Sequence, residues 1–321
     1  MEFGLGHVIR CTSFYDALIQ KNHNVTFVIH GDNSVKKILK ERNHKIRKWH
    51  NNICHLKKYL KRNDGVILDS TMIKQEEISI LCNCNIKLLV IDDYKRYKYE
   101  NAIVLDWTVN AEKSGVHEHN LRDNTLLLGL EYLVLRPEFY DYQVKLKTFE
   151  KIFISLGGSD IRSLIIPIVE NLRKCFPEIC ITVVTSAACF NEQRILNLND
   201  ANTKIYSCVD SKKLCKLIID CDVAISAGGQ SLYELATLNI PVVAIEVIEN
   251  QREDIAGWYQ AGLVTKVIKW NDRRIHDKIK TEILKLKPIS IRKKIQKRNK
   301  NKNISKTVHE IINKLVSKIK N

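Results

Sequence analysis

Residues 223–236 read VAISAGGQSLYELA, which is a short apolar run, a glycine pair and a helix-like pattern in succession. Apolar runs of this length are typical of strands buried in a parallel sheet. At Gly228 and Gly229 the backbone N–H groups can approach a ligand closely, and the N-terminus of the following helix favours negative charge. The stretch therefore predicts a phosphate-binding turn, although a tight turn without a ligand explains a single glycine pair equally well.

A second glycine pair, Gly157 and Gly158, follows the apolar run 151–156 and precedes Ser159. Ligands bind at the carboxyl ends of parallel strands, so two such turns in one sheet strengthen the prediction of a phosphate site. We expect Glu234, about one and a half helical turns beyond the other pair, to accept hydrogen bonds from a ribose diol; a solvated surface glutamate is the alternative. The other candidate ligand-binding residues of this half are Ala227, Gln230, Ser231, Asn250 and Gln251.

The whole chain alternates strand-like and helix-like patterns, and its 321 residues suggest about two domains with a cleft between them. The segment 129–137 has no clean period and ends at Pro137, so we place the domain boundary just after it. The expected domains are residues 1–138 and 139–270, followed by a helical extension, 271–321. The expected strands cover residues 25–29, 65–68, 87–91, 102–105, 151–156, 179–184, 223–226 and 240–245.

A histidine stands at the start of the first helix-like pattern, in the sequence Gly4-Leu5-Gly6-His7. The positive end of the helix dipole there disfavours an imidazolium ion and keeps the ring neutral. A neutral imidazole can accept a proton from water, so His7 is a candidate general base. A histidine that only caps its helix is the alternative.

The formal net charge of +16 is concentrated at the C-terminus. The segment 271–321 holds 17 Lys and Arg against 4 Asp and Glu, a net charge of +13, which leaves +3 for the segment 1–270. Helical spacing of the apolar residues there indicates an amphipathic helix with a cationic face; they are Ile304, Val308, Ile311, Ile312, Leu315 and Ile319. We expect this helix to dock on the protein; an anionic membrane surface or RNA partner is the alternative.

The remaining composition is typical of a cytoplasmic globular protein. No apolar run approaches the roughly 18 residues of a membrane span, and the first residues lack the pattern of a secretory signal. The ten cysteines have neither zinc-ribbon nor redox spacing and are expected to be reduced thiols. We expect a monomer without a metal or a cofactor and without a nucleic-acid partner.

The order of these motifs resembles the UDP-2,4-diacetamido-2,4,6-trideoxy-β-L-altropyranose hydrolases of pseudaminic acid biosynthesis and their spore-coat polysaccharide relatives. The resemblance extends from Gly4 to about Gly262. Its most specific part is Gly4-Leu5-Gly6-His7-Val8-Ile9-Arg10-Cys11. The further matching segments are Ile91-Asp92-Asp93, Gly129-Leu130-Glu131-Tyr132, Leu135-Arg136, Glu138-Phe139, Gly157-Gly158-Ser159-Asp160, Ser226 to Glu234, and Asn250-Gln251.

The resemblance implies an α/β GT-B fold, with two Rossmann-like parallel-sheet domains that face a central cleft, related to the glycosyltransferase that completes lipid II. It implies that UDP binds mainly to the second domain and that His7 activates water for attack on the anomeric carbon, releasing UDP with inversion. The residues it places near the substrate in the first part of the chain are Gly4, Gly6, Arg10, Asp69, Asp93, Tyr132 and Arg136.

Two features differ from the family pattern. The chain starts almost at the glycine turn, so we expect the family's first strand, central in the first sheet, to be missing. Thr71 stands where relatives often have a tyrosine near the sugar. The alternatives to the hydrolase are therefore a UDP-sugar glycosyltransferase of the same fold and a truncated, inactive relative.

Overall fold

The computed structural model describes most of the chain. The described residues are 6–39, 41–50, 52–53, 56, 58–60, 65–84, 86–93, 95, 97–109, 111–113, 123–140, 142, 144, 147–186, 189–300 and 308–320. Gly4, one of the predicted ligand contacts, and Ile304 of the predicted amphipathic helix lie outside them. The chain divides into two compact units: a C-terminal unit with residues Leu135–Asn303, and an N-terminal unit with residues Leu5–Val134 and Ile304–Asn321.

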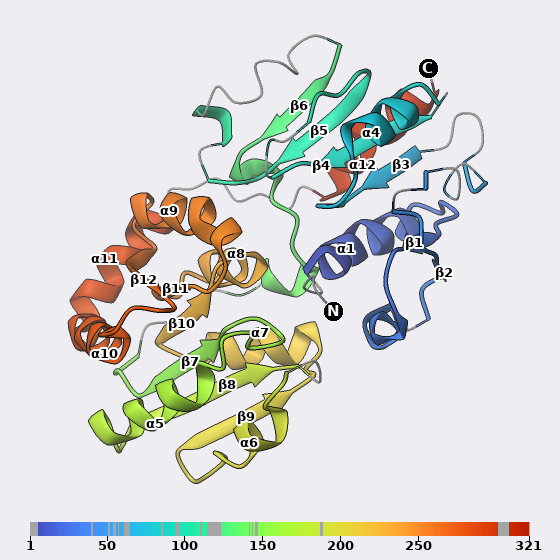
Figure 1. Ribbon diagram of the computed structural model, residues 1–321. Coiled ribbons are helices and arrows are strands. Elements are labelled where there is room, and N and C mark those ends of the chain that lie inside the picture. Colours follow the sequence, from blue (N-terminus) through green and yellow to red (C-terminus); the bar gives the residue numbers. More distant parts are fainter. Residues whose placement is uncertain are drawn as a thin grey trace. The chain divides into compact units, whose positions relative to one another are not determined.

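The C-terminal unit is built on a six-stranded parallel sheet in the order β12-β11-β10-β7-β8-β9 (Figure 1). Its strands are β7 (Lys151–Ser155), β8 (Cys180–Thr185), β9 (Thr203–Ser207), β10 (Val223–Ala227), β11 (Val242–Glu246) and β12 (Val264–Lys269). Every residue of β10 and β11 is buried. This burial explains why both strands are continuous apolar runs in the sequence.

The order of these strands reverses between β7 and β10. From β7 the chain moves outward to β8 and β9, then returns to β10 and moves outward in the other direction to β12. Parallel crossovers are right-handed, so the helices change from one face of the sheet to the other at this point. The helices of the crossovers are α5 (Ile165–Cys175), α6 (Glu192–Leu196), α7 (Ser211–Ile219), α8 (Gln230–Thr237) and α9 (Arg252–Gln260).

Two further helices complete the C-terminal unit, α10 (Ile275–Leu286) and α11 (Ile289–Lys300). Arg292 of α11 is fully buried, with its guanidinium carbon lying 5.5 Å from the centre of the Phe149 ring. It donates hydrogen bonds to the carbonyl oxygens of Leu286, Lys287 and Lys147 at 2.5–2.9 Å. This arginine joins α10 and α11 to the segment that enters β7.

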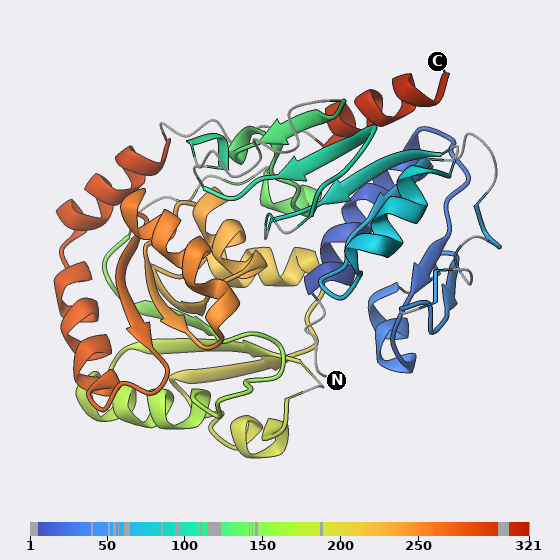
Figure 2. The ribbon, with the colours of Figure 1, turned by 45° about the horizontal axis from the view of Figure 1, so that its top comes forward.

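The N-terminal unit contains two separate parallel sheets (Figure 2). The larger has the order β3-β4-β5-β6, and the smaller pairs β1 with β2. These strands are β1 (Phe27–Ile29), β2 (His44–Ile46), β3 (Gly65–Leu68), β4 (Lys87–Ile91), β5 (Ala102–Asp106) and β6 (Thr125–Leu128). The described α-helices of the segment 5–134 are α1 (Gly6–Gln20), α2 (Lys36–Leu39) and α4 (Gln75–Cys82).

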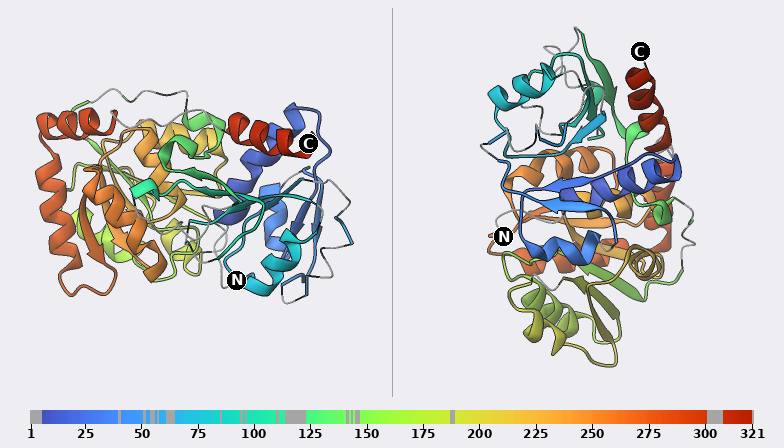
Figure 3. Two further views of the ribbon diagram at one scale, coloured as in Figure 1. Left: turned by 90° about the horizontal axis from the view of Figure 1, so that it is seen from above. Right: turned by 90° about the vertical axis from the view of Figure 1, so that its right-hand side faces the viewer.

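Helix α12 (Val308–Lys320) belongs to the N-terminal unit, although it lies at the other end of the sequence. It packs on α1, β3 and β4, and Figure 3 shows it beside α1 and on the opposite face of the four-stranded sheet from α4. Ile311, Ile312 and Leu315 are buried in this contact. The basic segment 271–321 is thus divided between the two units, with α10 and α11 in one and α12 in the other.

The predicted α/β class with parallel sheets is confirmed, and each of the eight expected strands is present within one or two residues at each end. Strands β2, β6, β9 and β12 were not predicted. The nine described cysteines are all free. No helix of the described residues is both long enough and apolar enough to cross a bilayer.

The packing of α12 predicts that Leu315→Ala destabilises the N-terminal unit. Leu315 is 2% exposed, and truncating a buried leucine costs about 2–5 kcal/mol of unfolding free energy. Hydrogen exchange of the α1 amides should accelerate accordingly. Lys314→Ala, at an exposed position of the same helix, should change the exchange free energy by less than about 0.5 kcal/mol. Equal exchange in the two variants would contradict the docking of α12.

Candidate functional site

The two glycine pairs follow the two central strands of the C-terminal sheet. Strands β7 and β10 are neighbours, and Ser155 pairs with Ser226, so Gly157 and Gly228 each stand two residues beyond a matched pair. This is the point where the strand order reverses, and open α/β sheets bind ligands in the crevice at such a point. The structure therefore brings the two predicted phosphate-binding turns to neighbouring positions at one edge of the sheet.

Gly228 is required by close packing. A Cβ atom at this position would lie 2.7 Å from Cβ of Gln251 and 3.0 Å from Cγ1 of Ile255. The Gln251 amide donates from Nε2 to the Gly228 carbonyl oxygen (3.2 Å), and its Oε1 accepts from the Val247 backbone N–H (3.2 Å). Gln251 thus ties the turn after β10 to the end of β11. Its neighbour Asn250 is exposed in the same short 3₁₀ helix, η6 (Glu249–Gln251).

Gly229 begins helix α8 with a φ angle of +94°, a left-handed conformation that favours glycine. Gln230 and Ser231 are the first two helical residues, and their backbone N–H groups belong to the first turn, whose donors have no partner within the helix. Ala227 is the last residue of β10. The geometry after β10 agrees with a strand, a glycine turn and a helix N-terminus that can receive an anion.

The turn after β7 differs from the sequence expectation. Gly157 has a φ angle of +82°, and a Cβ at Gly158 would lie 2.9 Å from Oγ of Ser186, but helix α5 begins only at Ile165. Asp160 accounts for the delay, because its carboxylate accepts hydrogen bonds from the N–H groups of Leu164 (3.0 Å) and Ile165 (3.1 Å). The first turn of α5 is thus occupied by a side chain of the protein. Gly157, Gly158 and Ser159 form a loop beside the sheet edge rather than a direct strand-to-helix turn.

Glu234 is buried, with 3% of its surface exposed, so it is not a solvated surface residue. Its Oε1 accepts a hydrogen bond from Nη2 of Arg136 at 2.5 Å. Burial raises the pKa of Glu234, and the positive charge of Arg136 opposes that rise. Arg136 also lies over the ring of Phe139, 5.1 Å from its centre. A buried carboxylate fixed by one arginine can accept further hydrogen bonds, because it has two oxygens.

A group of four ionisable side chains forms the candidate site of the N-terminal unit. His7 and Arg10 lie in the first turns of α1, Asp69 follows β3 and Asp93 follows β4. Nδ1 of His7 lies 2.6 Å from Oδ1 of Asp69. Arg10 donates to both oxygens of Asp69, at 2.5 and 2.6 Å, and to Oδ2 of Asp93 at 2.5 Å. The structure thus joins side chains that are far apart in the sequence, with 83 positions between Arg10 and Asp93.

The tautomer of His7 follows from its neighbours. The Asp69 carboxylate can only accept, so Nδ1 of His7 carries the proton and donates it. Nη2 of Arg10, 3.2 Å from the same nitrogen, is also a donor and therefore makes no hydrogen bond to it in this state. In the neutral form of the ring, Nε2 is then the nitrogen with the lone pair. With its side chain 29% exposed, His7 has the arrangement of a general base that is oriented by a buried carboxylate.

The charges around Asp69 hold it ionised. Burial raises the pKa of Asp69, but the attraction and hydrogen bonds of Arg10, followed by those of His7, outweigh burial and place the pKa far below its ordinary value. Burial and the Asp69 charge raise the pKa of the Cys11 thiol well above its usual range, so Cys11 is not a thiolate nucleophile.

Trp107, directly after β5, was not predicted from the sequence. The guanidinium of Arg10 lies 5.2 Å from the centre of its ring, and the side chain is 1% exposed. A tryptophan after an apolar run gives no sequence signal that separates a core residue from a support of the site. Gly6 is the first residue of α1, and Tyr132 ends the 3₁₀ helix η4 (Leu130–Tyr132). Burial and the nearby charges of Glu131 and Glu310 raise the pKa of Tyr132.

No group of three or more His, Cys, Asp and Glu side chains suited to a metal ion occurs within the described ranges.

Comparisons with known proteins bear on the fold and on the resemblance. No protein-family model matches the chain. It is 30% identical over 271 residues to the uncharacterized protein MJ1062 of Methanocaldococcus jannaschii, covering 79% of this chain and 55% of that protein. It is 27% identical over 255 residues to the pseudaminic acid cytidylyltransferase and UDP-2,4-diacetamido-2,4,6-trideoxy-beta-L-altropyranose hydrolase of Helicobacter pylori, covering 77% and 43%. The chain thus spans about half the length of these curated relatives.

Among solved structures, MurG of Acinetobacter baumannii superposes with a TM-score of 0.62 at 13% identity, over 97% of this chain and 96% of that one. The fold of the chain is therefore the GT-B fold, built from two Rossmann-like α/β units. Within that fold, the curated matches confirm the resemblance to the UDP-2,4-diacetamido-2,4,6-trideoxy-β-L-altropyranose hydrolases that the sequence motifs indicated.

The Arg10–Asp69 pair predicts an acid-sensitive N-terminal unit. Because the pKa of Asp69 is depressed in the folded state, its contribution is fully present above about pH 4, the unfolded value, and is lost as the pH falls further. Asp69→Asn should lower the unfolding free energy by about 3 kcal/mol at neutral pH, since Arg10 loses a buried partner. Below pH 4, the unfolding free energy of this variant should also decrease less steeply with pH than that of the wild-type protein.

The matched control is Asp16→Asn, which removes an ion pair with Arg42 in the same unit at a carboxylate that is 41% exposed. Its cost should stay below about 1 kcal/mol. Urea unfolding followed by NMR at the β4 amides measures both variants. Equal losses of unfolding free energy in the two variants would show that the buried ion pair contributes no more to stability than the exposed one.

Proposed function

We propose that this chain hydrolyses a UDP-linked diacetamido-trideoxy sugar to the free sugar and UDP, in the biosynthesis of a nonulosonic acid of the pseudaminic type. The observation that carries the proposal is the contact of His7 with the buried Asp69, at the start of α1. The printed names of the Helicobacter pylori and Campylobacter jejuni relatives support the choice of substrate.

The C-terminal unit is proposed to bind UDP. The loops at Gly157, Gly158 and Ser159 and at Ala227–Ser231 offer backbone N–H groups for the diphosphate, and the N-terminus of α8 adds its positive dipole end. Glu234 would bind the ribose hydroxyls through its carboxylate while Arg136 retains its hydrogen bond. Asn250 and Gln251 complete the proposed set of contacts to the sugar nucleotide.

The N-terminal unit is proposed to supply the base. Nε2 of His7 takes a proton from water as the water oxygen attacks the anomeric carbon, and Asp69 stabilises the imidazolium that forms. The bond between the anomeric carbon and the diphosphate oxygen breaks, and its electron pair leaves with UDP. Attack from the face opposite the leaving group inverts the sugar centre. Donors around the diphosphate stabilise the developing negative charge, so the reaction needs no metal or cofactor.

The residues around His7 are proposed to contact the sugar. Oδ1 of Asp93 is buried and has no hydrogen-bond partner among the described residues, so it is available to accept from a hydroxyl or acetamido N–H group. Arg10 fixes Asp93 and Asp69 through three short hydrogen bonds. Gly4, Gly6 and Tyr132 are the other proposed contacts. We also propose that the protein acts in the cytoplasm as a monomer without a nucleic-acid partner, and that the basic segment 271–321 can contact an anionic membrane surface.

Replacement of the proposed base should separate catalysis from binding. His7→Asn should lower kcat for UDP release about 10²- to 10⁴-fold, because general-base assistance is lost. The dissociation constant for UDP should change less than about twofold, since UDP binding is assigned to the other unit. UDP release is measured by a coupled assay, with UDP binding measured by calorimetry on the same variant. Unchanged kcat would remove His7 from the mechanism.

The same assay separates the alternative activities. UDP release that occurs in water without any added acceptor supports the hydrolase. Release that depends on an acceptor identifies a UDP-sugar glycosyltransferase of the same fold, and UDP binding without turnover of any UDP-sugar identifies an inactive relative.

Removal of the proposed ribose contact should weaken UDP binding. Glu234→Ala should raise the dissociation constant for UDP about 10- to 100-fold, the size expected for hydrogen bonds to a charged group. Glu253→Ala provides the control, because Glu253 is an exposed carboxylate in the first turn of α9. Calorimetry with UDP measures both variants, and equal affinities would exclude Glu234 as a nucleotide contact.

A further inference from the structure

A second cavity of the C-terminal unit lies away from the glycine turns, with a volume of about 780 Å³. It is bounded by α7, by the first residues of β7 and β8, and by Lys204 and Tyr206 of β9. Lys151 and Cys180 are the first residues of β7 and β8, and Asn202 directly precedes β9. Because all six strands are parallel, these residues mark the edge of the sheet opposite Gly157 and Gly228. None of the described residues assigned to the candidate UDP site lines this cavity.

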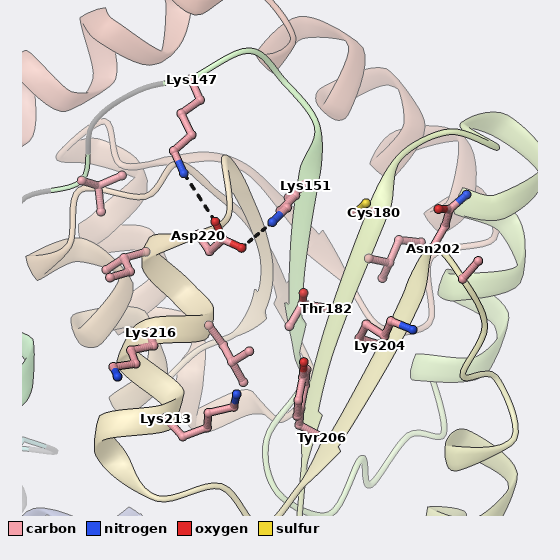
Figure 4. A pocket seen from close by; sticks show the side chains of 15 residues that line it. Lys147, Lys151, Cys180, Thr182, Asn202, Lys204, Tyr206, Lys213, Lys216 and Asp220 are labelled. Atoms are coloured by element: carbon pink, nitrogen blue, oxygen red, sulfur yellow. Dashed lines mark hydrogen bonds and ion pairs between the residues drawn. The ribbon is translucent and has the colours of Figure 1, made fainter.

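Positive charge dominates the lining. The lining contains five lysines and a single carboxylate, Asp220. We call this cavity the lysine groove. Its lysines are Lys147, Lys151, Lys204, Lys213 and Lys216. Figure 4 shows Lys147 and Lys151 directed at Asp220 from neighbouring positions. One carboxylate balances at most one of these two ammonium groups, so the cavity carries a clear excess of positive charge even at its most neutralised end.

The other end of the groove has no carboxylate among the described residues of its lining. Lys204 donates from Nζ to the backbone carbonyl oxygen of Asp200 at 2.9 Å, and Nζ of Lys213 lies 5.2 Å from the centre of the Tyr206 ring. Neither contact neutralises the charge of the lysine. Lys213 is the third residue of α7, so it also stands near the positive end of the helix dipole, whereas Asp220 is the residue that ends the helix. The carboxylate of Asp210 already caps this end of the helix by accepting from the Lys213 backbone N–H at 2.7 Å, so the lysine charges rather than the dipole favour an anion here.

The floor of the groove suits an organic group. Ile181, Leu217 and Ile219 contribute apolar surface, and the ring of Tyr206 contributes a flat face. Ordinary solvated lysines on a protein surface spread apart, since like charges repel. Here five of them line one concavity, whose volume lies within the range of about 300–1,000 Å³ that is usual for small-molecule sites. A membrane or a nucleic acid would engage a broader and flatter basic surface.

We propose that the lysine groove is a second ligand site, which binds a small molecule carrying a diphosphate or another group with several phosphate charges. The site is distinct from the proposed UDP site, because the described residues assigned to the two sites do not overlap. Lys204, Lys213 and Lys216 bind the phosphates, and the apolar floor with Tyr206 receives the remainder of the ligand.

Binding of inorganic pyrophosphate to the full chain tests the proposal. Calorimetry is performed at low ionic strength and without UDP, because UDP carries a diphosphate itself and would compete for the groove. The wild-type protein should bind pyrophosphate, and Lys204→Glu/Lys213→Glu should lose at least about tenfold in affinity, the equivalent of about 1.4 kcal/mol. The control Lys174→Glu/Lys280→Glu makes the same change in net charge at exposed positions of the same unit outside the groove, and it should retain wild-type affinity.

Other outcomes overturn the proposal. Equal losses in the two double variants would show attraction by overall charge, and an unchanged groove variant would show that pyrophosphate binds elsewhere. The milder pair Lys213→Gln/Lys216→Gln should also weaken binding, which keeps the test decisive if the charge-reversed variant does not fold. Glu234→Ala should leave pyrophosphate binding to the groove unchanged, so failure of the proposed UDP site does not affect this result.

Discussion

The parallel pairing of β7 with β10 is the constraint on which the C-terminal unit depends. It joins two strands that are separated by three crossovers in the sequence, and it sets the point where the chain reverses its direction across the sheet. Only this pairing brings the loops at Gly157 and Gly228 together. The steric demands at Gly228, where Gln251 and Ile255 leave no room for a side chain, then fix the turn against the end of β11. The strand topology thus brings the two loops together, and the residues at the turn then fix their conformation.

Both units place an arginine beside a buried carboxylate of the candidate site. Arg10 holds Asp69 in the N-terminal unit, and Arg136 holds Glu234 in the C-terminal unit. A buried carboxylate without a partner would become protonated, and it would then lose its value as an acceptor. Arg10 therefore keeps Asp69 charged, whereas Arg136 only opposes the rise that burial causes in the pKa of Glu234. Burying such ion pairs costs desolvation energy. The pairs are therefore better explained by the need to position the carboxylates than by a gain in folding stability.

The sequence predicted every central strand of the described sheets, but of the six edge strands it predicted only β1 and β3. All four strands that escaped prediction, β2, β6, β9 and β12, are edge strands of their sheets. An edge strand is partly solvated, so polar residues interrupt its apolar run, as in the half-exposed Thr203–Ser207. In the site, glycine pairs and His7 carry a local signal. The Asp69 contact of His7 and the Arg136 contact of Glu234 depend on residues 62 and 98 positions away, which no local pattern specifies.

The position of the positive charge in the folded protein could not be predicted from the sequence either. Counting charged side chains assigns nearly all of the excess charge to the segment 271–321 and leaves the segment 1–270 with only +3. Yet the lysine groove lies wholly within the segment 1–270. A net charge near zero over a long segment constrains only the sum, whereas the local field depends on which side chains folding brings together. Lys147 and Lys213 are far apart along the chain, and the return from β9 to β10 through α7 places them at one cavity. The electrostatics that matter for small-molecule binding are thus a property of the topology, just as the diphosphate loops are.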